Sequence, residues 1–182
     1  IVVLRETQEG EARVALMPES IKKLTSLGAS IQVESRAGLS AARTDDDYRE
    51  AGAEVTPDRE ALLAAADVLA VVNRPAANDF ARLRKGAVVI GFLRPLDEPA
   101  ALLPALDRGV TTFSVELIPR ITRAQAMDAL SSQAALAGYY AVLIGATNIA
   151  RMLPMMTTAV GSIRPQKALV MGLGVAGLQA LA

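Results

Sequence analysis

Residues 119–133 read Pro-Arg-Ile-Thr-Arg-Ala-Gln-Ala-Met-Asp-Ala-Leu-Ser-Ser-Gln, a polar stretch that leads directly into a long apolar segment. Thr122 and Gln125 fit the capping-box pattern, in which a threonine hydroxyl and a side chain three residues later bind the free amides of a helix start. The pattern predicts a helix that begins at Arg123. The chain before it is typical of one α/β domain, and the chain after it leads into a second.

The first turns of this helix present polar groups on one side. Gln125, Asp128 and Ser131 follow one another at intervals of three residues, so they are neighbours on the helix surface. Arg120 lies just upstream, in the entering loop. The free amides and the dipole of a helix N-terminus favour an anionic or polar ligand. The stretch therefore predicts a ligand site made of a guanidinium, an amide, a carboxylate and a hydroxyl.

Residues 1–122 alternate between strand-like and helix-like segments. The segments expected as strands are residues 1–4, 29–34, 67–73, 86–92 and 110–115. The segments expected as helices are residues 17–28, 44–52, 56–66, 80–84 and 99–108, with Pro104 kinking or splitting the last one. This alternation predicts an N-terminal α/β domain of the Rossmann-like kind, with a doubly wound parallel sheet.

Residues 123–153 are expected to form a long helix between two domains. Its apolar residues lie on all sides, which predicts a helix enclosed by the rest of the protein. Residues 129–150 hold no charged side chain, and a hydropathy criterion alone would suggest a membrane span. Serines, Gln133, Gly138 and two tyrosines interrupt the stretch, so a buried core helix is favoured and no transmembrane segment is predicted.

A glycine motif follows the last expected strand, residues 167–171. Gly172, Gly174 and Gly177 form G-x-G-x-x-G after a strand and before a helix, which is the context of a dinucleotide-binding loop. An ordinary glycine-rich turn is the alternative. The acidic ribose-binding residue of such folds stands about 20 residues further on. Residues 154–182 are therefore expected to be the beginning of a second, truncated Rossmann nucleotide-binding domain.

The composition excludes several kinds of chemistry. The chain has 19 basic and 19 acidic residues, which gives no bulk charge for nucleic acid. It has no cysteine, so a reducing compartment is the default, and no histidine, the commonest general base. Three consecutive aspartates at 45–47 are better explained as a helix start than as a metal site. No metal is predicted.

Two polar loops follow expected strands at their carboxyl ends, where open α/β sheets usually bind ligands. One comprises residues 5–13, and the other begins at Asn73 and Arg74. For residues 5–13, a solvated turn with Gly10 at its tip explains the spacing equally well.

Several segments together resemble a known family. They are residues 120–133, Ala-Gly-Tyr at 137–139, Pro-Met-Met-Thr at 154–157, Gly-Leu-Gly-Val-Ala-Gly-Leu-Gln at 172–179, and the N-terminal residues 6, 10–15, 18 and 19. They are similar to the NAD(H)-binding alpha subunit of proton-translocating NAD(P) transhydrogenase. The related alanine dehydrogenases share the N-terminal pattern. That family has a substrate lysine where Asn73 stands and a catalytic histidine where Arg94 stands, so both departures argue against oxidative deamination.

The resemblance implies roles for residues at the start of the long helix and in the glycine motif. Arg120, Gln125, Asp128 and Ser131 would surround the nicotinamide and its ribose, with Arg123 nearby, and Arg120, Gln125 and Asp128 would be the catalytic residues. Gln125 would face the neighbouring nucleotide domain. Gly172, Gly174, Val175, Ala176 and Gly177 would hold the pyrophosphate. Hydride transfer between two nicotinamides moves no proton to or from the protein, so a site without histidine suffices.

The resemblance also implies partners. NADH bound here would pass hydride to NADP held by a partner domain, coupled to proton translocation through membrane subunits. The subunit would be a homodimer, cytoplasmic or on the matrix side, and peripheral to the membrane. Two alternatives stay open: an alanine-dehydrogenase-like amino-acid oxidoreductase, and a non-catalytic fragment of either protein. The 182-residue chain by itself is expected to be inactive.

Overall fold

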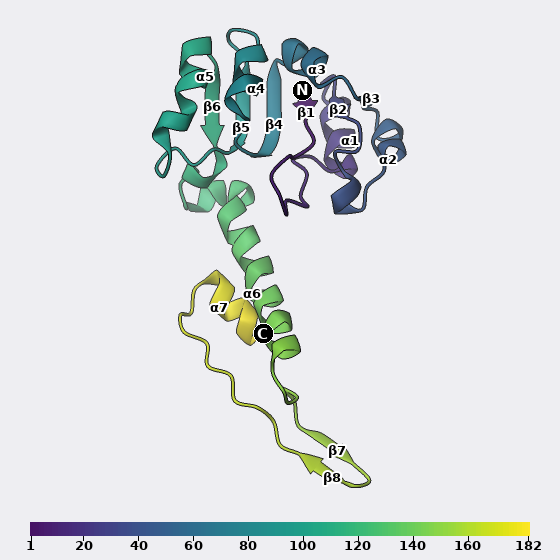
Figure 1. Cartoon of the computed structure of the whole chain (residues 1–182), viewed down its shortest axis with the longest axis vertical. Helices are drawn as coiled ribbons and strands as arrows, with labels where there is room; N and C mark the ends of the chain where they lie inside the picture. The colour runs from purple at the N-terminus through teal and green to yellow at the C-terminus, as the bar shows by residue number, and fades with distance from the viewer. The chain divides into compact units, whose positions relative to one another are not determined.

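Strands and short helices alternate through Ile1–Ile118, the first of two units into which the chain divides (Figure 1). The computed structural model describes all 182 residues. The strands of this unit form one six-stranded sheet in the order β3-β2-β1-β4-β5-β6, and all neighbouring strands are parallel. They are β1 (Val2–Val3), β2 (Gln32–Glu34), β3 (Glu54–Thr56), β4 (Val68–Asn73), β5 (Val88–Phe92) and β6 (Thr111–Ser114).

Two hydrophobic cores lie on opposite faces of this sheet, because successive residues of a strand point to opposite sides. Val2 belongs to the core with helices α3 (Arg59–Ala65), α4 (Ala77–Arg82) and α5 (Leu103–Arg108). Its neighbour Val3 belongs to the other core, with α1 (Pro18–Ser26) and α2 (Asp45–Glu50). Helices on both faces of a parallel sheet confirm the predicted doubly wound α/β fold.

Local signals in the sequence set the helix ends of this unit. Thr44 and Asp47 form a complete capping box at the start of α2, which explains the three aspartates there. Pro104 splits the predicted helix 99–108 into a 3₁₀ turn, η2 (Pro99–Leu102), and α5. The remaining 3₁₀ turns are η1 (Leu39–Ala41) and η3 (Val115–Leu117).

Strand β3 was not predicted. Its three residues follow α2 after only a short turn, and the alternation of Glu54-Val-Thr56 is too brief to distinguish a strand from a loop. Pairing with β2 at all three positions makes it a strand.

The second unit, Pro119–Ala182, begins with a 3₁₀ turn, η4 (Thr122–Met127), and continues with α6 (Ala129–Asn148). An antiparallel hairpin follows, made of β7 (Met156–Thr158) and β8 (Gly161–Ile163). Helix α7 (Val175–Leu181) ends the unit and packs against α6.

The predicted helix start at Arg123 is wrong. Residues 122–127 form η4 instead, and the side chain of Thr122 makes no capping bond there. The α-helix begins six residues later, with Asp128 as its N-cap. Aspartate is among the best N-cap residues because its short carboxylate accepts bonds from the first free amides, so it sets the boundary in place of Thr122 and Gln125.

Two further predictions for this unit are wrong. Residues 167–171 form no strand, because no other strand of the chain lies beside them to accept their hydrogen bonds. Helix α6 is not enclosed either: only Gly138 is buried, and large side chains such as Leu136 and Tyr140 are exposed in this chain. By length and composition alone α6 could cross a membrane, a weak criterion that core helices of soluble proteins also meet.

Candidate functional site

The start of α6 is built around one carboxylate. Asp128 Oδ1 accepts the backbone amide of Ser131 at 2.9 Å, and Asp128 Oδ2 accepts the Ser131 hydroxyl at 2.6 Å. The bonds from Ser131, first from its hydroxyl and then from its amide, lower the pKa of the Asp128 carboxyl from its ordinary value, and the charge of Arg120 adds to the effect.

The bond to Asp128 determines whether the Ser131 hydroxyl donates or accepts in its other hydrogen bonds. An ionised carboxylate has no proton to donate, so the Ser131 hydroxyl uses its own proton toward Asp128. The lone pairs of Ser131 Oγ therefore remain to accept a bond from another molecule. Ser131 Oγ can therefore accept a hydrogen bond but not donate a second one while it is bound to Asp128.

The glycine motif forms a tight loop before α7. Gly172 has φ +99°, a conformation that side chains rarely adopt. A Cβ on Gly177 would lie 2.0 Å from the Gly172 carbonyl oxygen, so only glycine allows the loop to fold back on the helix. A Cβ on Gly174 would meet no atom within 4 Å, which leaves the space in front of its backbone open. These glycine geometries are present although residues 167–171 form no strand.

Close packing brings this loop to the start of α6. A Cβ on Gly138 would lie 2.1 Å from the Ala176 carbonyl oxygen, so α6 and α7 approach more closely than any side chain at position 138 permits. This glycine was not singled out in the sequence. The sequence could have indicated this contact, because a single glycine inside an apolar helix often marks a close approach by another segment. It does not indicate which segment approaches.

A cavity of about 340 Å³ opens where the loop meets α6. Seven of the residues predicted to bind a ligand line it, together with Ala134 and Met171, which were not predicted: Arg120, Ser131, Gly172, Gly174, Val175, Ala176 and Gly177. Ala134 lies one helical turn after Ser131, and that spacing could have identified it.

Three predicted site residues do not line this cavity: Arg123, Gln125 and Asp128. Asp128 reaches it indirectly, through its bonds to Ser131. Gln125 is exposed, and because Asp128 caps α6, its side chain is not used as a helix cap. The capping role predicted for Gln125 is therefore wrong, and its side chain is not engaged at the start of α6. Arg123 is exposed as well.

A second cavity, of about 470 Å³, lies in the first unit at the carboxyl end of β4. Its polar lining comes from the two loops singled out in the sequence, with Glu6, Thr7 and Gln8 from one and Asn73 and Arg74 from the other. The Asn73 amide nitrogen donates to Glu6 at 3.2 Å and to Glu11 at 2.9 Å. Glu11 in turn accepts two bonds from the Arg13 guanidinium. The interpretation of residues 5–13 as a purely solvated turn is therefore wrong for Glu6 and Glu11.

Comparison with protein families gives two adjoining matches. Residues 2–137 match the alanine dehydrogenase/PNT N-terminal domain, and residues 141–182 match the alanine dehydrogenase/PNT C-terminal domain. The chain belongs to the alanine dehydrogenase/PNT family. The C-terminal match contains the glycine loop and α7, while Arg120 and Ser131 fall in the N-terminal match.

Members of both branches of the alanine dehydrogenase/PNT family are similar to the chain. An NAD(P) transhydrogenase alpha subunit of Rhodospirillum rubrum is 44% identical over 187 residues, which cover 100% of this chain and 49% of that protein. The alanine dehydrogenase of Mycobacterium tuberculosis is 31% identical over 178 residues, which cover 96% of this chain and 47% of that protein. The chain thus spans about half the length of these curated relatives.

Solved structures of the family have the same fold. A transhydrogenase from Sinorhizobium meliloti superposes with a TM-score of 0.95 at 48% identity, over 99% of this chain and 54% of that one. An L-alanine dehydrogenase superposes with a TM-score of 0.85 at 23% identity, over 99% of this chain and 50% of that one. At that identity the second match shows the fold alone.

Proposed function

We propose that this chain belongs to the NAD(H)-binding component of a transhydrogenase, which passes hydride between NADH and NADP bound on a partner domain. The observation that supports this function most strongly is the cavity that joins Arg120 and Ser131 to the glycine loop 172–177. The identity of 44% to a transhydrogenase alpha subunit supports the choice of reaction.

The lining of the cavity fits a dinucleotide. The space in front of Gly174 is open, and a side chain at position 174 would occupy it. The backbone amides around this space suit a pyrophosphate. Arg120 adds a cation that can bind a phosphate or a carboxamide oxygen. Ser131, with its proton committed to Asp128, accepts a bond from the carboxamide N–H or from a ribose hydroxyl. Arg123 is a further cation in η4, near these groups in sequence.

The residues of this site bind and orient, and none needs to transfer a proton. NADH supplies the hydride when it is bound. Arg120 and Ser131 would fix the ring, and Asp128 would hold Ser131 in position. Gln125, exposed on η4 and without a capping role, would contact the partner nucleotide domain. Positioning of this kind can supply a large share of the rate of a two-substrate reaction.

The alternative, oxidative deamination of an amino acid, is disfavoured by two positions. By the resemblance, Asn73 stands where alanine dehydrogenases have the substrate lysine; its amide is bound to Glu6 and Glu11. By the same resemblance, Arg94 stands where they have the catalytic histidine; it pairs with Asp97 and Glu98 at 3.4 Å. Neither side chain can replace the group it stands for.

Exposed apolar residues on α6 support assembly with a second copy of the chain. We propose a homodimer of this component on that ground. The resemblance to transhydrogenase adds the NADP-binding domain and membrane subunits that would couple the reaction to proton translocation. This component would lie at the cytoplasmic or matrix side, peripheral to the membrane.

Titration of NADH against the protein extended to the full length of its transhydrogenase relatives tests the proposal. We expect Arg120→Ala to weaken NADH binding by about 10-fold or more, because a charge-assisted hydrogen bond is lost. Arg151→Ala is the matched control, since Arg151 is in the same unit but outside the cavity. Failure of the unsubstituted protein to bind NADH would refute the proposal.

Single-turnover reduction of an NADP analogue, with the partner domain present, tests the reaction itself. Gln125→Asn should slow hydride transfer and weaken NADH binding only modestly. Reduction of NAD with alanine as the substrate would instead support the amino-acid dehydrogenase. The 182-residue chain should bind NADH less tightly than the extended protein, because residues 167–171 lack strand neighbours to support the glycine loop. Equal affinities would contradict that last expectation.

A further inference from the structure

The order of strands in the first unit creates a crevice beside Glu6. Strands β1 and β4 are neighbours, but the chain leaves β1 toward α1 on one face of the sheet and leaves β4 toward α4 on the other. At such a reversal the following loops separate, and α/β proteins commonly bind ligands between them. The cavity of about 470 Å³ lies at this point, with Glu6 and Asn73 in its lining.

Strand β4 extends past its neighbour here. Strand β1 pairs with β4 only at Leu69 and Ala70. The pairing of β4 with β5 is irregular between Ala70 and Asn73. The last amides of β4 therefore need acceptors that β1 does not provide, since unpaired buried amides are costly.

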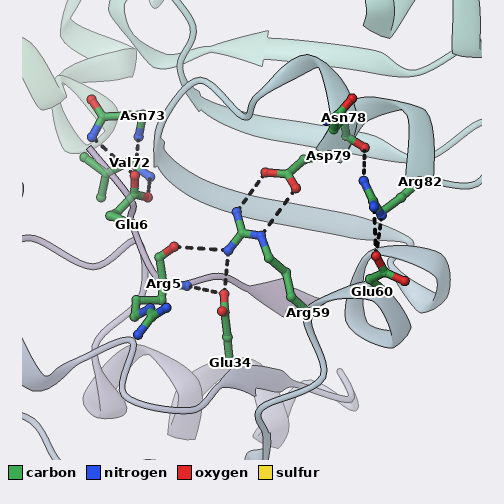
Figure 2. A network of polar contacts seen from close by, with 10 residues as sticks. All are labelled: Arg5, Glu6, Glu34, Arg59, Glu60, Val72, Asn73, Asn78, Asp79 and Arg82. Atoms are coloured by element: carbon green, nitrogen blue, oxygen red, sulfur yellow. Dashed lines mark hydrogen bonds and ion pairs between the residues drawn. The ribbon is translucent and has the colours of Figure 1, made fainter. Parts of the chain in front are cut away.

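Glu6 supplies those acceptors (Figure 2). Its Oε1 accepts the Val72 amide at 2.6 Å, and its Oε2 accepts both the backbone amide and the side-chain amide of Asn73 at 3.2 Å. Two consecutive backbone amides and a side-chain amide directed at one carboxylate are the kind of donor set with which proteins bind anions.

Nearby cations are occupied by other carboxylates. Arg59 binds Glu34 at 2.6 Å and Asp79 at 2.8 Å, as Figure 2 shows, and Arg74 binds Glu98 at 2.6 Å. The Arg13 guanidinium is hydrogen-bonded to Glu11, and its charge also interacts with Glu6. The direct hydrogen bonds to the Glu6 carboxylate come from the three amide donors.

We propose that the amide donors of Val72 and Asn73 at the end of β4 form a carboxylate-binding site occupied by the chain's own Glu6, and that this site binds a small free carboxylate when the Glu6 side chain is removed. While Glu6 is in place, these three amide donors are not available to an acid from solution. This inference does not rest on the proposed function, because it concerns a different unit and a different ligand.

Acetate is a matched probe, since alanine at position 6 retains Cβ and acetate replaces the missing CH₂–COO⁻ group. Glu6→Ala and Glu6→Gln in the 182-residue chain should both lower the melting temperature at pH 7. Acetate at about 0.1 M, compared with chloride at equal ionic strength, should raise the melting temperature of Glu6→Ala by about 3 °C or more. The unsubstituted chain should not respond, because its site is filled.

Glu6→Gln is the specificity control. Glutamine fills the same space but turns an N–H toward the amide donors of Asn73, so it should be destabilised without responding to acetate. Glu9→Ala, an exposed neighbour, should behave like the unsubstituted chain. If Glu6→Ala is unfolded in chloride, recovery of its circular dichroism signal in acetate alone is the same test. An equal response of all the variants to acetate, or no response of Glu6→Ala, would overturn the inference.

Discussion

At the scale of single residues, one carboxylate can order a whole loop. Glu11 accepts bonds from the Arg13 amide and guanidinium and from the Asn73 amide, and its side chain is only 9% exposed. These bonds, first of all that from the Arg13 side chain, lower the pKa of Glu11 from about 4.5 to about 2. The sequence placed Glu11 in a polar loop but gave no sign of its partner 62 residues away.

Glu11 should make stability depend on pH in acid. A carboxyl whose folded-state pKa is depressed stabilises the fold fully above its unfolded pKa, and this contribution is lost as the pH falls from about 4.5 toward 2. Glu11→Gln should therefore lower the urea midpoint at pH 7, and the difference from the unsubstituted chain should shrink between those two pH values. Glu9→Gln provides the control for an exposed loop glutamate. A difference that stays constant down to pH 2.5 would disprove the assignment.

Among the secondary-structure elements, the capping-box pattern occurs twice, and it caps a helix at Thr44 but not at Thr122. Thr44 and Thr122 each precede a polar residue by three positions, and both fit the capping-box rule. Only Thr44 caps a helix, because Asp128 is a stronger competitor for the start of α6. Local patterns therefore predicted α1, α2 and the split at Pro104. They could not show that Asp128, and not Thr122, would be the N-cap of α6.

Replacement of each threonine separates these cases. Thr44→Ala should destabilise the chain by about 1 kcal/mol, the usual cost of a lost N-cap. Thr122→Ala, at an exposed position without a capping bond, should change the unfolding free energy by less than about 0.5 kcal/mol. Urea denaturation monitored by circular dichroism measures both. Equal losses would mean that Thr122 caps η4 in solution.

Two glycines of α6 make a similar pair. Gly138→Ala places a methyl group 2.1 Å from the Ala176 oxygen, whereas Gly145→Ala meets no atom within 4 Å. We expect Gly138→Ala to be destabilised by about 1–3 kcal/mol and to expose α7 to protease. Gly145→Ala should gain up to about 1 kcal/mol from helix propensity alone. Proteolysis at the same rate in both variants would show that α6 and α7 do not pack as described.

For the whole molecule, predictions of strands and of burial were correct only where the chain also contains the neighbouring strand or the covering surface that the segment packs against. The six strands of the first unit pair with one another, and five of them were predicted. Residues 167–171 have strand-like side chains but no neighbouring strand, so a prediction from propensity was wrong. The apolar pattern of α6 likewise predicted burial, which requires a covering surface that the chain itself does not provide.

A second copy of the chain is the covering surface that we expect for α6. Leu136, Tyr140 and Leu143 follow at spacings of four and three, so they form one exposed apolar stripe. The full-length protein should sediment as a dimer, and Leu143→Arg should dissociate it because a buried unpaired charge is costly. Leu27→Arg is the matched control, since it adds the same charge at an exposed leucine of the first unit. Dissociation by both substitutions, or by neither, would place the dimer contact elsewhere than on this stripe.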